Sequence, residues 1–235
     1  MKTILTIFIS LVFCFSSFAQ DITEKTVKDS FALSYTFTSN VKNEHKMQDN
    51  TYLRKVEIYR TNVTEKIMKY DFLCMKFEIK GPNDVMYIKK VAYIFDEISF
   101  LVDDNGKIID IIKPANMDER WIKAKEEILL DFTGNAITNF LKQVDEVIED
   151  KEKLMAFFQS DNMYGLFLKG MSEIENPSES SKIKISEKVG VKIITPKTES
   201  KEETEQYTFK DNILNYAIKT VGNIKYEINF LKQIN

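Results

Sequence analysis

The stretch SFLVDDNGKIIDII, from Ser99 to Ile112, decides how the first half of the chain folds. On either side of its centre, apolar residues recur at every second position, which is the period of a strand with one buried face. Asn105 and Gly106 lie between the two runs, and both residue types adopt positive φ angles at little cost. An Asn-Gly pair between alternating runs is a strong signal for a β-hairpin. The stretch therefore predicts two antiparallel strands joined by a turn.

The acidic centre of this stretch also suggests a calcium-binding loop, which the spacing argues against. Such a loop of twelve residues has glycine at its sixth position and oxygen ligands at its first and twelfth. With Gly106 at the sixth position, the first falls on Leu101 and the twelfth on Ile112. Neither side chain carries an oxygen, so we expect a turn and no metal site.

The chain before the hairpin shows the same two-residue period. In SFALSYTFT, for example, Phe31, Leu33, Tyr35 and Phe37 fall on one face of the predicted strand. Polar or Gly-Pro-containing loops separate the strand-like runs, and no helical pattern intervenes before the hairpin ends. This order predicts an antiparallel meander rather than βαβ units. The predicted strand runs cover residues 30–38, 51–67, 70–81 and 87–102.

The pattern changes after Pro114, where apolar residues recur at helical spacing. Asn116 and Glu119 form a variant of the capping box, which predicts the start of a helix, and Gly134 predicts its end. Two further amphipathic runs follow, and they predict a block of about three helices between residues 116 and 171. Because an amphipathic helix must bury one face, we expect this block to pack on the sheet.

Strand patterns return in the last part of the chain. The run IKYEINFLKQI places Ile224, Tyr226, Ile228 and Phe230 on one face, so the last strand should be tied into the sheet. We therefore predict an α+β fold, a curved antiparallel β-sheet meander with an inserted block of about three α-helices packed on it. Residues 20–235 are expected to form a single domain, with strands at about 28–113, helices at about 116–171 and strands at about 182–234.

The first 19 residues have the features of a secretory signal peptide. Lys2 precedes an apolar core, and small residues precede a cleavage site after Ala19. A lipoprotein anchored at Cys14 is disfavoured because the bulky Phe13 precedes it. After cleavage, no run reaches the roughly 20 apolar residues of a transmembrane helix. The composition is typical of a Gram-negative bacterium, so we expect a mature protein exported to the periplasm or beyond.

Composition argues against several classes of function. Removing residues 1–19 removes one charge, that of Lys2, so the net charge changes from −3 to −4, and a general nucleic-acid binder is disfavoured. His45 and Cys74 are the one histidine and the one cysteine that remain, which leaves too few ligands for an ordinary zinc site. Neither a Gly-x-Gly-x-x-Gly nor a Walker A motif is present. We expect no cofactor, and a non-catalytic role is favoured over an enzymatic one.

Aromatic residues are the remaining feature, with 17 Phe and 10 Tyr. They fill a core, or they line a cavity for an apolar ligand between a curved sheet and the helices. The candidate cavity residues are Phe77, Phe95, Phe100, Trp121, Phe140 and Tyr226.

Three hypotheses follow, in decreasing order of preference. The first is a non-catalytic module that binds a protein or an envelope component. The second is a carrier or sensor of a small lipophilic molecule. The third is a carboxylate-dependent hydrolase, which requires acidic side chains to converge in a cleft.

Overall fold

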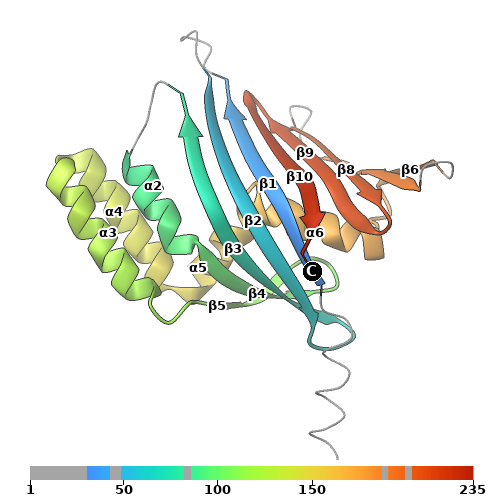
Figure 1. Cartoon of the computed structure of the whole chain (residues 1–235), viewed down its shortest axis with the longest axis horizontal. Coiled ribbons are helices and arrows are strands. Elements are labelled where there is room, and N and C mark those ends of the chain that lie inside the picture. The colour runs from blue at the N-terminus through green and yellow to red at the C-terminus, as the bar shows by residue number, and fades with distance from the viewer. Residues whose placement is uncertain (1–30, 43–48, 82–85, 187–189, 199–202, 235) are drawn as a thin grey trace, which may run out of the picture.

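The structure is a computed structural model that describes residues 31–42, 49–81, 86–186, 190–198 and 203–234. In these residues, ten strands form one antiparallel sheet, and five α-helices accompany it (Figure 1). The sheet does not close on itself, which confirms the predicted α+β fold with a curved meander. The predicted signal peptide and His45 lie outside the described residues.

The sheet consists of two meanders joined at its centre. Its strand order is β5-β4-β3-β2-β1-β10-β9-β8-β7-β6, so the first strand of the chain pairs with the last. This pairing confirms that the C-terminal strand is tied into the sheet. The strands are β1 (Phe31–Val41), β2 (Asn50–Asn62), β3 (Ile67–Lys80), β4 (Glu97–Asp103), β5 (Ile108–Ile112), β6 (Lys182–Ser186), β7 (Val191–Thr195), β8 (Glu203–Lys210), β9 (Ile213–Val221) and β10 (Ile224–Gln233).

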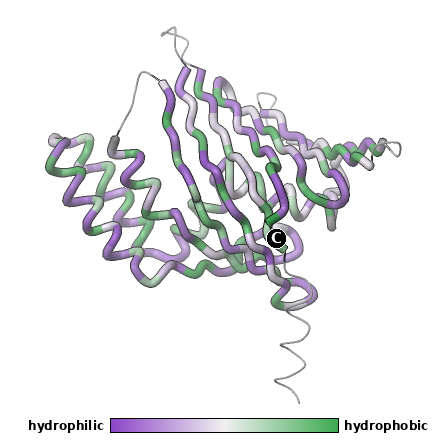
Figure 2. Tube along the Cα trace, viewed as in Figure 1, coloured by the Kyte–Doolittle hydropathy of each residue, from purple (hydrophilic) through white to green (hydrophobic). Residues whose placement is uncertain are grey.

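The two faces of the sheet differ in polarity, and hydrophobic and hydrophilic residues intermingle along its strands (Figure 2). On one face Leu33, Tyr35 and Phe37 of β1 are buried. On the other face polar side chains bond across strands, as where Thr51 donates to the Asn40 amide oxygen at 2.9 Å. Register shifts interrupt four of the strand pairs, and such bulges increase the local twist of a sheet.

The first helix lies between β3 and β4 in the sequence, and the other four connect the two edge strands, β5 and β6. The helices are α2 (Met86–Ala92), α3 (Met117–Asp131), α4 (Asn135–Glu149), α5 (Lys151–Ser160) and α6 (Tyr164–Glu175), with a 3₁₀ turn, η1 (Tyr93–Phe95), after α2. The Asp150 carboxylate caps α5 by accepting the N–H groups of Glu152 and Lys153. The Asp161 carboxylate accepts the N–H groups of Met163 and Tyr164, where α6 begins. No helix in the described residues is long and apolar enough to cross a membrane.

Helix α6 lies against the apolar face of the sheet (Figure 1). Its Phe167 ring contacts four aromatic rings from β1 and β3, with centroid distances of 5.2 to 6.1 Å to Tyr35, Phe37, Tyr70 and Phe72. Gly170 allows a close approach to β8, because a Cβ atom there would lie 2.8 Å from ring carbons of Tyr207. The apolar face of α6 therefore forms the centre of the core.

The prediction of strand for residues 87–102 was wrong in its first half. Residues 86–95 form α2 and η1, and β4 begins only at Glu97. The Tyr87 ring packs on Phe132 and Phe140 at 5.5 and 5.3 Å, and Val91, one turn later, also packs on the core. Tertiary packing of this helical face overrides the strand preference of its Tyr, Ile and Val residues.

The predicted helix ends also need correction. Asn116 does precede α3, but its side chain makes no capping hydrogen bond. Helix α3 ends at Asp131, and the N–H of Phe132 bonds to the Ile128 carbonyl. Gly134, with φ of 107°, precedes α4 as its N-cap instead of closing α3.

Candidate binding cleft

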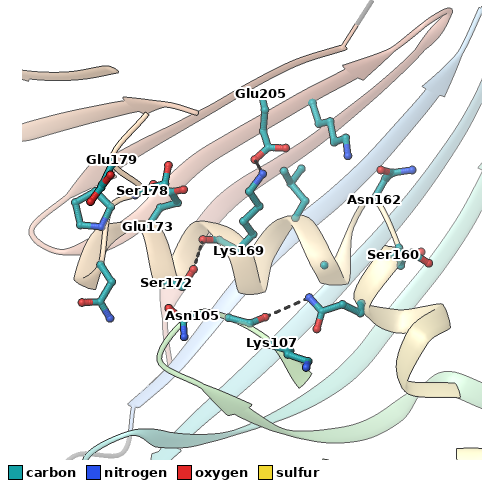
Figure 3. A pocket seen from close by; sticks show the side chains of 18 residues that line it. Asn105, Lys107, Ser160, Asn162, Lys169, Ser172, Glu173, Ser178, Glu179 and Glu205 are labelled. Carbon is teal, nitrogen blue, oxygen red and sulfur yellow. Dashed lines mark hydrogen bonds and ion pairs between the residues drawn. The ribbon is translucent and has the colours of Figure 1, made fainter. Parts of the chain in front are cut away.

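A cleft of about 970 Å³ lies beside α6 on the helix-covered side of the sheet (Figure 3). The β4–β5 turn and the end of α5 form one wall, and β8 and β9 contribute to another. The segment that follows α6 closes the remaining side. The β4–β5 turn, the continuous segment from the end of α5 to the residues after α6, β8 and β9 therefore meet at this cleft.

The predicted hairpin is confirmed, and its turn forms part of the cleft wall. The Asp103 carboxylate accepts the N–H groups of Asn105 and Lys107 at 3.0 and 2.8 Å, so this acidic residue shapes the turn. Gly106 has φ of 77°, and a Cβ atom there would lie 2.9 Å from the Ser172 hydroxyl oxygen on α6. Glycine is therefore required both by the backbone and by the contact with the helix.

Two amide side chains hold this turn in place. Gln159 at the end of α5 accepts the N–H of Ile108 at 2.6 Å and donates to the Gly106 carbonyl at 3.3 Å. Asn176, after α6, donates to the Asp104 carbonyl at 3.1 Å. The turn is thus bonded to both helices that border the cleft.

On the sheet side, the main feature is the carboxylate of Glu205 on β8, a residue that is only 4% exposed. Lys169 of α6 forms an ion pair with it at 2.7 Å (Figure 3). The hydroxyl of Tyr207 donates to the same carboxylate oxygen. Burial, together with the charges of Glu205 and Glu173, raises the pKa of Tyr207 well above its usual value. The phenol therefore remains a hydrogen-bond donor to the carboxylate.

A second acidic side chain, Glu173, lies near the end of α6 and is 5% exposed. One of its oxygens accepts the N–H of Ser178 and the hydroxyl of Ser181, both at 3.1 Å. Glu173 and Glu205 both line the cleft, so folding does bring two acids together. In the described residues, both carboxylates are held by donors from the protein.

The six aromatic residues predicted to line an apolar cavity lie at several places in the core and outside this cleft. Phe95 and Phe100 both pack on Phe158, with ring centroids 5.4 and 5.0 Å away. Phe77 lies under the Arg54 guanidinium, and Phe140 packs on Tyr87. The indole N–H of Trp121 donates to Asp145, and Tyr226 is partly buried on β10. Their role as ligand-cavity residues remains a prediction.

A second polar group surrounds Cys74 on β3. Burial raises the pKa of its thiol, and the nearby Asp96 carboxylate adds to this effect, while Arg54 opposes it. The thiolate is the reactive form of cysteine, so this environment disfavours reactivity. Burial also raises the pKa of Asp96 to about 6, against the lowering influence of Arg120 and Arg54.

Sequence reasoning identified the turn at Asn105-Gly106 but not the cleft that it borders. The ion pair between Lys169 and Glu205 joins residues on α6 and β8, and no spacing rule connects such a pair. The alternation of β8, with Glu205 two residues before the buried Tyr207, places that acid on the helix-covered face. This two-residue period was the one sequence signal that could have identified Glu205 as a candidate site residue.

Comparisons with known proteins add little. No protein-family model matches the chain, and no curated protein matches its sequence. One similar solved structure is described as "Lipid-protein interactions in lipovitellin", with 10% sequence identity and a TM-score of 0.33. The match covers 87% of this chain and 25% of that one, so the chain spans about a quarter of its length. Similarity at this level carries no argument about function.

Proposed function

We propose that this protein is an exported, non-catalytic binding module that holds a polar part of a protein or envelope component in the α6 cleft. The observation that carries the proposal is the cleft itself, with about 970 Å³ of space beside two buried, hydrogen-bonded carboxylates. Such a preorganised wall suits recognition, because few groups must be ordered when the ligand binds. Export is inferred from the leader-like sequence of residues 1–19.

The lining suggests the chemical character of the ligand. Asn105, Asn162 and Asn176 offer amide groups that both donate and accept hydrogen bonds, and Lys107 and Glu179 place opposite charges in the lining. Groups of this kind pair well with peptide bonds and with zwitterionic groups. A short polar peptide segment or a polar envelope component fits this cleft better than a hydrocarbon chain does.

The lipophilic carrier remains an alternative that rests on the aromatic content. Rings from the sheet and from α5 and α6 contact each other at 5.0 to 6.3 Å, as in a packed core. An apolar ligand between the sheet and α6 would have to separate these rings. The convergence of Glu173 and Glu205 is what keeps a carboxylate-dependent hydrolase as a further candidate.

The first test is native mass spectrometry of the mature protein purified gently from its own host. We expect an additional polar ligand or partner chain on the wild type and on Lys153→Trp, whose exposed lysine lies outside the cleft lining. Lys107→Trp, which puts a bulky side chain at an exposed lining position, should lose that mass. Retention of the mass by Lys107→Trp would contradict the cleft proposal, and a lipid mass would favour the carrier.

A further inference from the structure

The two edge strands of the sheet differ in how far other parts of the chain cover them. At the β5 edge, the N–H of Ile108 donates to the Gln159 side chain of α5 at 2.6 Å. The Asp110 carboxylate accepts the N–H of Ile111 at 2.7 Å and forms an ion pair with Lys151 of α5. Helix α5 and its side chains therefore cover this edge, as is usual for edge strands that must not pair with another chain.

Strand β6 forms the opposite edge and has no comparable cover in the part of the chain that the structure describes. It pairs with β7 on one side, and all five of its residues are exposed. Figure 1 shows it at the end of the sheet, well away from α2–α5. In an edge strand of an antiparallel sheet, alternate N–H and C=O groups point outward and are available to another strand.

The pairing register of β6 with β7 shows which side chains of β6 lie on each face of the sheet. Ile183 lies opposite the buried Ile194, so Ile183 and Ile185 project on the same side as α6. They are 43% and 69% exposed, which is high for isoleucine. Lys182 and Lys184 project on the opposite side and are exposed in the part of the chain that the structure describes.

We propose that the β6 edge accepts an extended segment of a partner protein in which acidic and apolar residues alternate. The backbone of such a segment would continue the ladder as an eleventh strand. Its apolar side chains would lie beside Ile183 and Ile185, and its carboxylates beside Lys182 and Lys184. Cross-strand pairs of these two kinds stabilise antiparallel sheets, so the edge selects both the alternation and the charge. This inference does not depend on the α6 cleft.

A second copy of this chain is a poor occupant of the same edge. In antiparallel pairing of β6 with itself, a register centred on Lys184 places the two Lys184 side chains directly opposite each other. A register centred on Ile183 places Lys182 opposite Lys184. Like charges in these positions are destabilising, so the lysines disfavour these two registers of self-pairing, whereas an acidic strand would place opposite charges beside them.

The test uses the mature protein and three synthetic hexapeptides, one that alternates Glu and Val, one that alternates Lys and Val, and one with three Glu followed by three Val. We expect the alternating acidic peptide to bind most tightly in calorimetry. We also expect it to slow amide hydrogen exchange in β6, because its backbone would pair with the outward N–H groups. The block peptide has the same composition but cannot satisfy both faces of the strand.

The matched variants are Lys182→Glu/Lys184→Glu and, as a control, Lys123→Glu/Lys153→Glu on exposed positions of α3 and α5. The first should weaken binding of the acidic peptide about tenfold and favour the Lys-Val peptide, whereas the control should change neither. The proposal is overturned if no peptide binds at millimolar concentration, if the block peptide binds equally well, or if both variants respond alike.

Discussion

The ring of Phe167 on α6 packs edge-on against the ring of Tyr35 on β1, with centroids 5.2 Å apart. Tyr35 also contacts Phe230 of β10 at 5.6 Å, so one ring links the helix to both central strands of the sheet. Burial raises the pKa of the Tyr35 phenol far above its usual value, and within the described residues its hydroxyl has no hydrogen-bond partner. The contact therefore stabilises the fold through apolar packing.

Phe167→Ala should be among the most destabilising single changes in this core. Its side chain is fully buried and its loss leaves a cavity between α6 and the sheet, so we expect a loss of about 3 to 5 kcal/mol in the free energy of unfolding. Urea denaturation followed by circular dichroism measures it. Leu130→Ala, at a side chain that is 84% exposed, is the control and should change stability by less than about 0.5 kcal/mol. Similar losses for both variants would show that α6 is not central to the core.

Gly106→Ala should destabilise the protein and disturb the cleft. A positive φ costs a non-glycine residue about 1 to 2 kcal/mol, and here the added methyl group also meets the Ser172 hydroxyl. Gly222→Ala is the matched control, because its φ is 56° and no atom of the described residues lies within 4 Å of the place that its methyl group would occupy. We expect thermal unfolding to show a larger loss for Gly106→Ala. Equal losses would mean that the turn does not press on α6.

The difference between these two glycines illustrates what sequence can and cannot predict. Asn105-Gly106 identified the hairpin because turn geometry depends on neighbouring residues. The contact between Gly106 and α6 joins positions more than 60 residues apart, and no local pattern encodes it. The same applies to residues 86–95, where local composition favoured a strand. Tyr87 instead meets Phe132 and Phe140, and this distant contact stabilises a helix.

Asp96 should give the stability of the protein a specific pH dependence. Its folded pKa of about 6 lies above the unfolded value, so the folded state binds the proton more tightly. Between about pH 4 and pH 6 the stability contributed by this group therefore falls as pH rises, and the penalty persists above pH 6. Asp96→Asn should remove that fall, so its stability advantage over wild type grows from pH 4 to pH 6 and then levels off. Melting temperatures across this range test it, and an advantage that is constant with pH would contradict it.

Asp145 should show the opposite behaviour. Burial alone would raise its pKa, but hydrogen bonds from Lys125 and Trp121, both at 2.6 Å, and the charge of Lys125 keep the pKa below its usual value. Its contribution to stability is thus present above the unfolded pKa of about 4 and is lost as pH falls through the lower folded value. Asp145→Asn should cost about 1 to 3 kcal/mol at pH 7, with a smaller cost below about pH 4. Chemical denaturation at pH 7 and pH 3 measures both values, and an equal cost at the two pH values would rule out this electrostatic role.

The candidate cleft was less predictable from the sequence than the sheet, because it too depends on contacts between distant parts of the chain. Sheet positions follow a period of two along each strand, so Tyr35, Phe37 and Ile228 could be assigned to the core from sequence alone. The cleft depends on Lys169, Glu173 and Glu205, which are charged residues in a chain that has 69 of them. The burial of Glu173 and Glu205, and the ion pair of Glu205 with Lys169, depend on how closely α6 approaches β8, and that distance is set by tertiary packing.

The last strand offers a direct test of which face is buried. Phe230 packs against Tyr35 on the helix-covered side, whereas the adjacent Leu231 is 47% exposed. Phe230→Glu would place a charge in the apolar layer, so we expect a loss of about 3 kcal/mol or more, while Leu231→Glu should cost less than about 1 kcal/mol. Urea denaturation of the two variants and of the wild-type mature protein measures both losses in the free energy of unfolding. If Leu231→Glu were the more destabilising variant, then Tyr226, Ile228 and Phe230 would lie on the exposed face and not on the buried one. The register of β10, which joins the two halves of the sheet, would then be wrong as well.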